Sequence, residues 1–140
     1  MTRIAAFFLG ASLLAAAAPS LAADRTAQRG EQQLAKIVAD RIAGKPVNCI
    51  RLHDVRSSQV LDGTAIVYEG LGGRLYVNRP DIGAESLRRD DILLTKTWGD
   101  ELCHIDTVRL LDRGSRFEHG FVGLGEFVPY DRPKTKPSQG

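Results

Sequence analysis

Apolar residues recur at helical spacing in the first polar part of the chain, about residues 26–44. These apolar positions are Leu34, Ile37, Val38 and Ile42. The positions between them are mostly charged or polar, and Gly44 and Pro46 end the pattern. The segment therefore predicts one amphipathic helix, whose single apolar stripe would pack on a flat apolar surface such as a sheet.

After Pro46 the helical pattern gives way to short runs of aliphatic and β-branched residues, separated by glycine and aspartate. The runs are NCIRLHDV, SQVLD, TAIVYEG, RLYVNR, DILLTKT, ELCHID continuing into TVRLLD, and FEHGFVGLGEFVPY. Connections this short join antiparallel strands, because parallel neighbours need a crossover of about a dozen residues or more. We expect an α+β domain with one N-terminal amphipathic helix packed on a curled antiparallel sheet of about six strands in meander order.

Glycines mark the best-defined turn. Gly70, Gly72 and Gly73 separate TAIVY from RLYVN, where a tight reversal requires positive φ values, so these two runs predict a hairpin. The segment 79–90 predicts a longer loop, and TWGDE at 97–101 predicts a turn that joins two further strands.

The first residues predict a secretory signal peptide. Arg3 is followed by an apolar run over 4–18 and by small residues that fit cleavage after Ala22. The run of 15 residues is shorter than the roughly 20 needed to cross a bilayer. We therefore expect residues 1–22 to be removed, the protein to be periplasmic or secreted, and no stable membrane insertion after cleavage.

Removing 22 of the 140 residues leaves 118, which is enough for one domain and too few for two. The expected single globular domain covers residues 23–131, with its β-rich part at about 47–130. Loss of Arg3 leaves 18 basic residues against 17 acidic ones, a balance that argues against a nucleic-acid partner. Residues 132–140, which are rich in proline and lack apolar residues, predict a flexible tail.

The two cysteines, Cys49 and Cys103, allow three interpretations. In an oxidising compartment, two cysteines on neighbouring strands form a disulfide more often than they remain unpaired, so we expect that bond. A zinc or catalytic-thiol site is the remaining alternative, because His53 and His104 lie nearby in sequence. Side-chain alternation opposes a shared metal site, since the adjacent residues Cys103 and His104 point to opposite faces of a strand. We expect no metal and no cofactor.

Five residues are candidates for ligand binding: Arg51, His53, Trp98, His104 and Asp106. Asp106 is two residues from His104 and could orient its imidazole, as a general base would require. Trp98, the single tryptophan, stands at a predicted turn, where it would either pack at the edge of the core, the commoner arrangement, or be exposed as a platform for a ligand. Arg51, together with arginines 74, 79 and 109, could line a groove for an anion.

Several segments give the chain a family resemblance. They are NCI-R, RLYVNRP, LCHIDTVRLLDR and the closing GLGEFVPY, in which Gly125, Phe127, Pro129 and Tyr130 form the pattern G-x-F-x-P-Y. Over about residues 47–130 the chain resembles a family of small exported proteobacterial proteins that is classed as a domain of unknown function. The resemblance implies export and a compact β-rich domain, and it supplies no activity or catalytic residues.

No P-loop, nucleophile elbow, paired C-x-x-C or H-E-x-x-H motif occurs in the sequence. This favours a small exported, non-enzymatic module that binds an unknown protein or small ligand in the cell envelope. The alternatives are a small hydrolase or other enzyme that uses the His53, His104 and Asp106 region, or an inhibitor of an exported enzyme.

Overall fold

The computed structural model describes residues 21–134, which form one α-helix, ten strands and three short 3₁₀ helices. The helix is α1 (Leu21–Ile37), and the 3₁₀ helices are η1 (Leu52–Asp54), η2 (Leu71–Gly73) and η3 (Ala84–Ser86). The strands are β1 (Ile42–Ala43), β2 (Cys49–Arg51), β3 (Ser57–Leu61), β4 (Ala65–Glu69), β5 (Leu75–Asn78), β6 (Asp91–Thr95), β7 (Glu101–Cys103), β8 (Thr107–Asp112), β9 (Glu118–Gly123) and β10 (Phe127–Asp131). No helix within the described residues is long and apolar enough to span a bilayer. Most of the expected signal peptide, at residues 1–20, and residues 135–140 of the expected tail lie outside the described part.

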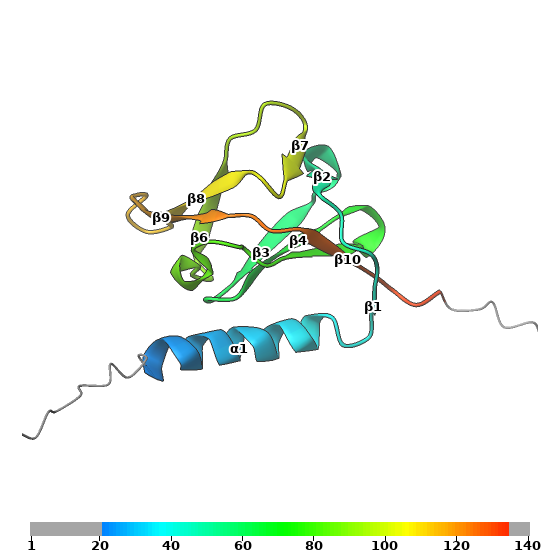
Figure 1. Cartoon of the computed structure of the whole chain (residues 1–140), viewed down its shortest axis with the longest axis horizontal. Helices are drawn as coiled ribbons and strands as arrows, with labels where there is room; N and C mark the ends of the chain where they lie inside the picture. The colour runs from blue at the N-terminus through cyan, green and yellow to red at the C-terminus, as the bar shows by residue number, and fades with distance from the viewer. Residues whose placement is uncertain (1–20, 135–140) are drawn as a thin grey trace, which may run out of the picture.

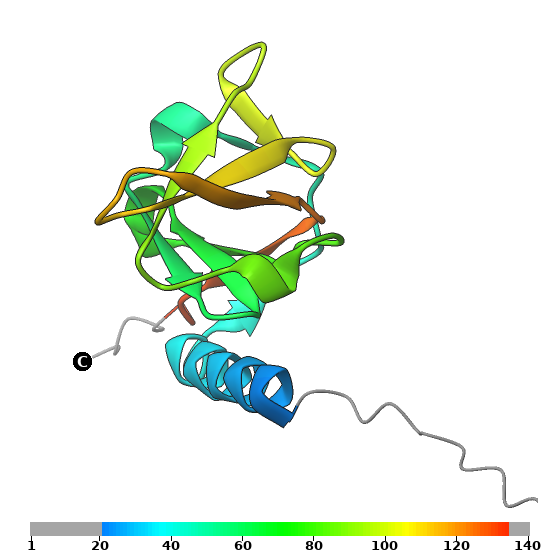
Figure 2. The same ribbon diagram turned by 90° about the vertical axis from the view of Figure 1, so that its left-hand side faces the viewer.

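The strands form three antiparallel sheets, so the α+β class is confirmed and the single sheet of about six strands is wrong. The sheet orders are β1-β10-β5-β4-β3, β6-β8-β9 and β2-β7. The five-stranded sheet is the middle layer: α1 covers one face, and the two smaller sheets cover the other (Figures 1 and 2). Two apolar cores result, one on each face of the middle sheet.

β4 lies in the interior of the middle sheet and contributes to both cores. Ile66 and Tyr68 pack toward the smaller sheets, whereas Ala65 and Val67 pack toward the layer of α1. Burial on both faces explains why this strand reads as a continuous apolar run rather than as an alternating one.

The hairpin predicted for TAIVY and RLYVN is present as β4 and β5, which pair from Ile66 opposite Asn78 to Glu69 opposite Leu75. Its turn contains positive φ angles at Gly72 and Gly73, whereas Gly70 is extended.

The predicted helix boundaries, 26–44, are wrong at both ends. α1 begins at Leu21 and ends at Ile37, and the chain then turns so that Ile42 and Ala43 pair with β10 as strand β1. Ile42 is exposed and does not extend the apolar stripe of the helix. The spacing of Ile42 fits a helical period, but pairing of its backbone with the edge of β10 determines the local structure instead.

α1 docks where Gly30 meets the turn between β3 and β4. Thr64 in that turn donates its hydroxyl hydrogen toward the carbonyl oxygens of Ala27 and Asp62, at 3.2 and 3.0 Å. A Cβ atom on Gly30 would overlap the Thr64 side chain and lie 2.6 Å from the Asp62 carbonyl oxygen. An ion pair between Glu31 and Arg79 ties the same helix to the end of β5 and lowers the pKa of the Glu31 carboxyl below its usual range.

We expect Gly30→Ala to lower the free energy of unfolding by about 1–3 kcal/mol, because the new methyl group meets backbone that cannot move aside cheaply. Helix propensity alone would favour alanine by about 1 kcal/mol, so the sign of the change tests the close contact. Urea denaturation measures it. Gln33→Ala, at an exposed position of α1, is the matched control and should be neutral or slightly stabilising. An unchanged or raised midpoint for Gly30→Ala would contradict the docking geometry.

The segment pattern G-x-F-x-P-Y has a structural role. The side-chain amide of Asn78, fully buried in β5, donates to the Gly125 carbonyl oxygen at 2.6 Å and accepts from the Gly125 N–H at 3.3 Å. Phe127 then fills the core, and Tyr130 packs beside the helix-facing core. These contacts fix the path by which the chain enters β10.

Candidate functional site

A disulfide joins Cys49 of β2 to Cys103 of β7, as the sequence predicts. The two residues are direct partners in the antiparallel β2–β7 ribbon. His104 N–H donates to the Asn48 carbonyl oxygen at 2.8 Å, so the cysteine pair beside it occupies a non-hydrogen-bonded position. Side chains approach most closely at such positions, which explains why these two sulfur atoms meet.

The disulfide also decides the metal and thiol alternatives. Within residues 21–134, the side chains of Cys49, Glu101 and Cys103 are the one group of three potential metal ligands whose ligand atoms lie within 4.8 Å of one another. Both sulfur atoms of that group are bonded to each other, and neither cysteine is free. A zinc site or a thiolate–imidazole pair cannot form while this bond is intact.

His104 and Asp106 do not form the predicted imidazole–carboxylate pair. Asp106 Oδ2 accepts the Cys103 N–H at 2.7 Å, and Asp106 N–H donates to the Cys103 carbonyl oxygen at 3.0 Å. The carboxylate therefore closes the turn after β7. Within the described chain, no hydrogen bond or ion pair joins His53, His104 and Asp106 to one another.

Arg51 ends the opposite strand of the same ribbon, β2, and His53 follows it in η1. Arg51 is exposed and faces Glu101 across the strands. His53 belongs to η1 rather than to a strand face shared with Cys49 and Arg51; its Nε2 lies 3.3 Å from Asp54 and its Nδ1 lies 3.9 Å from Asp100. The other arginines that could have formed an anion groove are instead paired singly: Arg74 with Asp131, Arg79 with Glu31 and Arg109 with Glu118.

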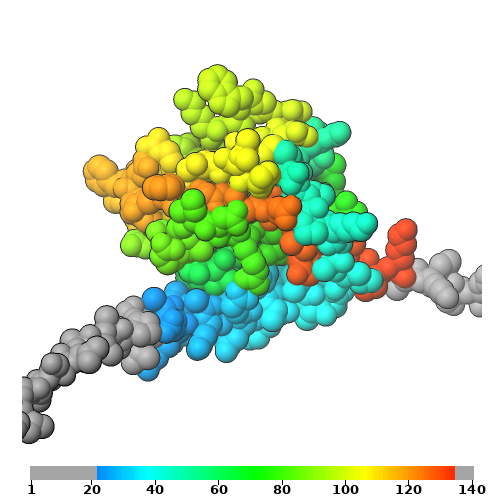
Figure 3. Space-filling view, in the orientation of Figure 1, coloured from blue at the N-terminus to red at the C-terminus, as the bar shows by residue number. Residues whose placement is uncertain are grey.

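Trp98 is fully exposed, at 101% of its reference area, and packing at the core edge is therefore not its role. It belongs to the loop between β6 and β7, which projects from the molecule on the side away from α1 (Figures 1 and 3). A shallow hollow of about 290 Å³ lies beside it, and Ile105 is 80% exposed on the same hollow. We call this the Trp98 surface; it is lined by Thr97, Trp98, Gly99, Asp100, Glu101, Cys103, Ile105 and Asp106.

The structure thus brings most of the predicted ligand-binding residues to one end of the molecule. Trp98 and Asp106 line the hollow, while Arg51 and His53 are linked to it through Glu101 and Asp100. The sequence analysis missed Ile105. An isoleucine followed by an aspartate between two strands could have indicated an exposed turn residue.

A second cluster was also missed. His119 Nε2 lies 2.7 Å from Asp91 Oδ1, and the Asp91 side chain is only 1% exposed. Leu110 lies opposite Gly120 and Leu111 opposite Glu118, so His119 is an extra residue in β9. This β-bulge turns the imidazole inward to the carboxylate, and bulges of this kind re-aim side chains. Asp91 Oδ2 in addition accepts the Arg88 N–H at 2.9 Å.

Comparison with known proteins adds no relative: the chain matches no protein-family model, no curated protein and no solved structure. The resemblance to small exported proteobacterial proteins stays a prediction.

Proposed function

We propose that the protein is an exported binding module that holds a partner protein through the Trp98 surface. The apolar leader at residues 4–18 and the disulfide both support export, since disulfides persist in oxidising compartments. The observation that carries the binding role is a fully exposed tryptophan at the end of a disulfide-linked ribbon. Large aromatic side chains left exposed in this way are typical anchors of interfaces.

The exposure of the anchors favours a protein over a small molecule as the partner. A small-molecule site encloses most of its ligand, commonly 70–90% of its surface. Trp98 and Ile105 line the hollow but are themselves almost wholly exposed, so the hollow is too shallow to enclose a ligand in this way. Covering a tryptophan removes about 150–250 Å² from water, which requires an extended opposing surface.

Charge specifies the chemistry of that partner. The lining of the Trp98 surface contains three carboxylates, from Asp100, Glu101 and Asp106, and no basic side chain. A lysine or arginine of the partner can stack on the Trp98 ring as a cation–π pair and face these carboxylates at once. The fitting partner is a segment with a basic residue next to an apolar one that covers Ile105.

Trp98 is expected to dominate this recognition. Selection of a random displayed peptide library on the disulfide-intact protein should enrich sequences in which arginine or lysine adjoins an apolar residue. Trp98→Ala should reduce binding of the enriched peptides at least about tenfold, because anchors of this type contribute about 2 kcal/mol or more. Its folding stability should change by less than about 0.5 kcal/mol, since the side chain makes no buried contact.

The matched control is Phe117→Ala, which removes an aromatic side chain that is 77% exposed and not part of the Trp98 surface. It should leave peptide binding unchanged. Enrichment of acidic peptides, no enrichment at all, or binding that survives Trp98→Ala would refute the proposal.

A further inference from the structure

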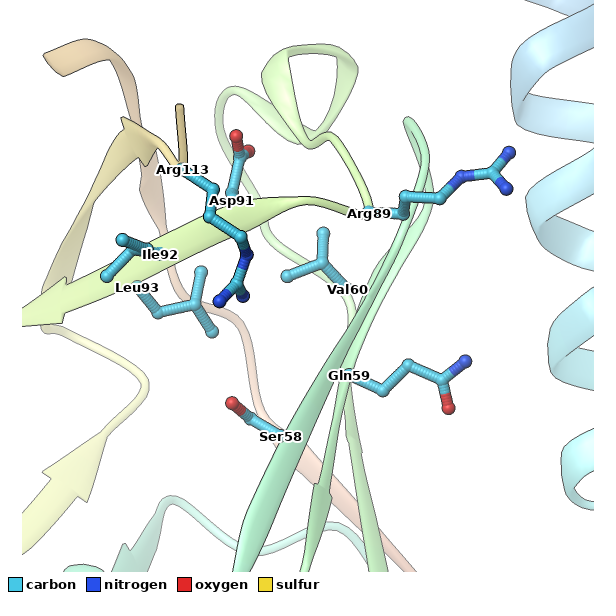
Figure 4. A pocket seen from close by; sticks show the side chains of 8 residues that line it. All are labelled: Ser58, Gln59, Val60, Arg89, Asp91, Ile92, Leu93 and Arg113. Atoms are coloured by element: carbon cyan, nitrogen blue, oxygen red, sulfur yellow. The ribbon is translucent and has the colours of Figure 1, made fainter. Parts of the chain in front are cut away.

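A larger cavity lies at a separate place, between the free edges of two sheets. β3 is the last strand of the five-stranded sheet, and β6 is the first strand of the three-stranded sheet. They are held together at one end, where Gly63 N–H donates to the Leu87 carbonyl oxygen at 3.0 Å and Arg89 pairs with Asp62. Figure 4 shows the two strands diverging from that end. The space between them, which we call the seam cavity, measures about 510 Å³ and is lined by Ser58, Gln59, Val60, Arg89, Asp91, Ile92, Leu93 and Arg113.

The seam cavity has an apolar part that continues into the protein core. Val60 is a buried member of the core between the sheets, and Leu93 packs against that core. Ile92 adds a further aliphatic side chain from β6. The volume is within the range of about 300–1,000 Å³ that is usual for small-molecule sites. An apolar group of a ligand could therefore enter between the strands.

The charged side chains around the seam cavity differ in whether they have partners. The Asp91 carboxylate is satisfied inside the protein by His119 and by the Arg88 N–H. Arg89 makes two side-chain hydrogen bonds to Asp62, at 3.2 and 3.1 Å. Arg113 has no ion pair or side-chain hydrogen bond within residues 21–134. Among the charged side chains that line the cavity, Arg113 is therefore the one without a hydrogen-bonding partner in the described part of the chain.

The backbone of Arg113 belongs to an ordered turn between β8 and β9. Asp112 Oδ1 accepts the N–H groups of Gly114 and Ser115 at 3.0 and 2.8 Å, and these bonds, chiefly that of Ser115, lower the pKa of the Asp112 carboxyl. In Figure 4, Arg113 reaches across β6 to the space beside Leu93, and the Ser58 hydroxyl points into the same region. The guanidinium and hydroxyl are donors beside the aliphatic side chains of Val60 and Leu93.

We propose that the seam cavity binds a small amphiphilic monoanion: a carboxylate received by Arg113, with an apolar body on Val60, Ile92 and Leu93. A guanidinium matches a carboxylate with two parallel N–H···O bonds, and Ser58 can donate a third. The site shares no residue with the Trp98 surface, so the two proposals stand or fall separately.

Octanoate is the probe. Octanamide keeps the apolar body but lacks the charge, and acetate keeps the charge but lacks the apolar body. In ¹H–¹⁵N NMR titrations of the disulfide-intact protein, octanoate should cause saturable shifts at the amides of Ser58–Val60 and Asp91–Leu93. Octanamide and acetate should each bind at least about tenfold more weakly. Arg113→Gln should weaken octanoate binding about tenfold and remove its advantage over octanamide, since a charged hydrogen-bonded pair is worth about 1.5–3 kcal/mol.

Arg116→Gln is the control, because Arg116 is an exposed arginine of the same turn that does not line the cavity. It should bind octanoate like the unaltered protein, as should Trp98→Ala. Three results would overturn the proposal: equal affinity for octanoate and octanamide, shifts confined to residues outside the seam cavity, or unchanged octanoate binding in Arg113→Gln with a native spectrum.

Discussion

Replacing both Cys49 and Cys103 with alanine is expected to reduce the free energy of unfolding by about 4 kcal/mol. The cysteines are 54 residues apart, and in the chain-entropy description a cross-link over a loop of that length restricts the unfolded chain by this amount. Small domains are stable by about 5–15 kcal/mol in total, so the loss is a large part of the whole. The melting temperature should fall by more than about 10 °C, measured by circular dichroism.

Reduction of the unaltered protein should reproduce this loss, because both treatments remove the same cross-link. The double variant itself should be insensitive to reductant, which separates the disulfide from other effects of the reducing agent. Intact-mass measurement after alkylation without reductant tests the bond directly, in protein expressed with residues 1–22 in place so that the predicted export can occur. Detection of two alkylated thiols together with stoichiometric zinc would instead support the alternative of a cysteine–histidine metal site.

The second large effect is expected at Phe127, whose side chain is fully buried at the junction of β10 and the core between the sheets. Its ring centroid lies 5.9 Å from that of Tyr68, and the two rings are tilted by 58°. Phe127→Ala removes this contact and leaves a cavity, at a cost of about 3–5 kcal/mol. Chemical denaturation measures the change.

Phe121→Ala provides the contrast on the neighbouring strand β9, where the phenylalanine is 54% exposed. It should cost less than about 1 kcal/mol. If Phe127→Ala yields no folded protein, Phe127→Leu keeps most of the volume and should lose about 1–1.5 kcal/mol. If Phe127→Ala and Phe121→Ala lowered the free energy of unfolding by similar amounts, the buried ring of Phe127 would not make the large contribution to stability that we expect.

The sequence was informative wherever a local pattern determined the structure. Two cysteines on predicted strands of a chain with a predicted export signal indicated the Cys49–Cys103 disulfide, and the glycines at 70, 72 and 73 indicated the β4–β5 hairpin. Strand pairing is less local. Alternation at Leu102 and Leu110 indicates which side chains are buried, but both residues face the same core from different sheets. For this reason the number of sheets could not be read from the chain.

The pair formed by His119 and Asp91 could not be predicted from the sequence for a different reason. His119 occupies the extra position of a bulge, and a bulge changes which face a residue occupies without changing the residue types around it. Asp91 begins the predicted strand run DILLTKT directly after the polar end of the predicted loop, and nothing in that position indicates that it is the one buried acidic side chain among residues 21–134. Arg113 likewise follows a strand in an ordinary polar turn, and only the divergence of β3 from β6 gives it a cavity to face.

The position of β10 has a consequence for how the chain reaches its native state. β10 lies between β1 and β5, and Ile42 pairs with Asp131, which is 89 residues further along the chain. The middle layer, with the cores on its two faces, therefore stays incomplete until residues 127–131 are available. Contacts of such long range slow folding and postpone it to the end of synthesis. Late closure of the middle layer agrees with the export that we propose, because it leaves time for the chain to cross a membrane before it folds.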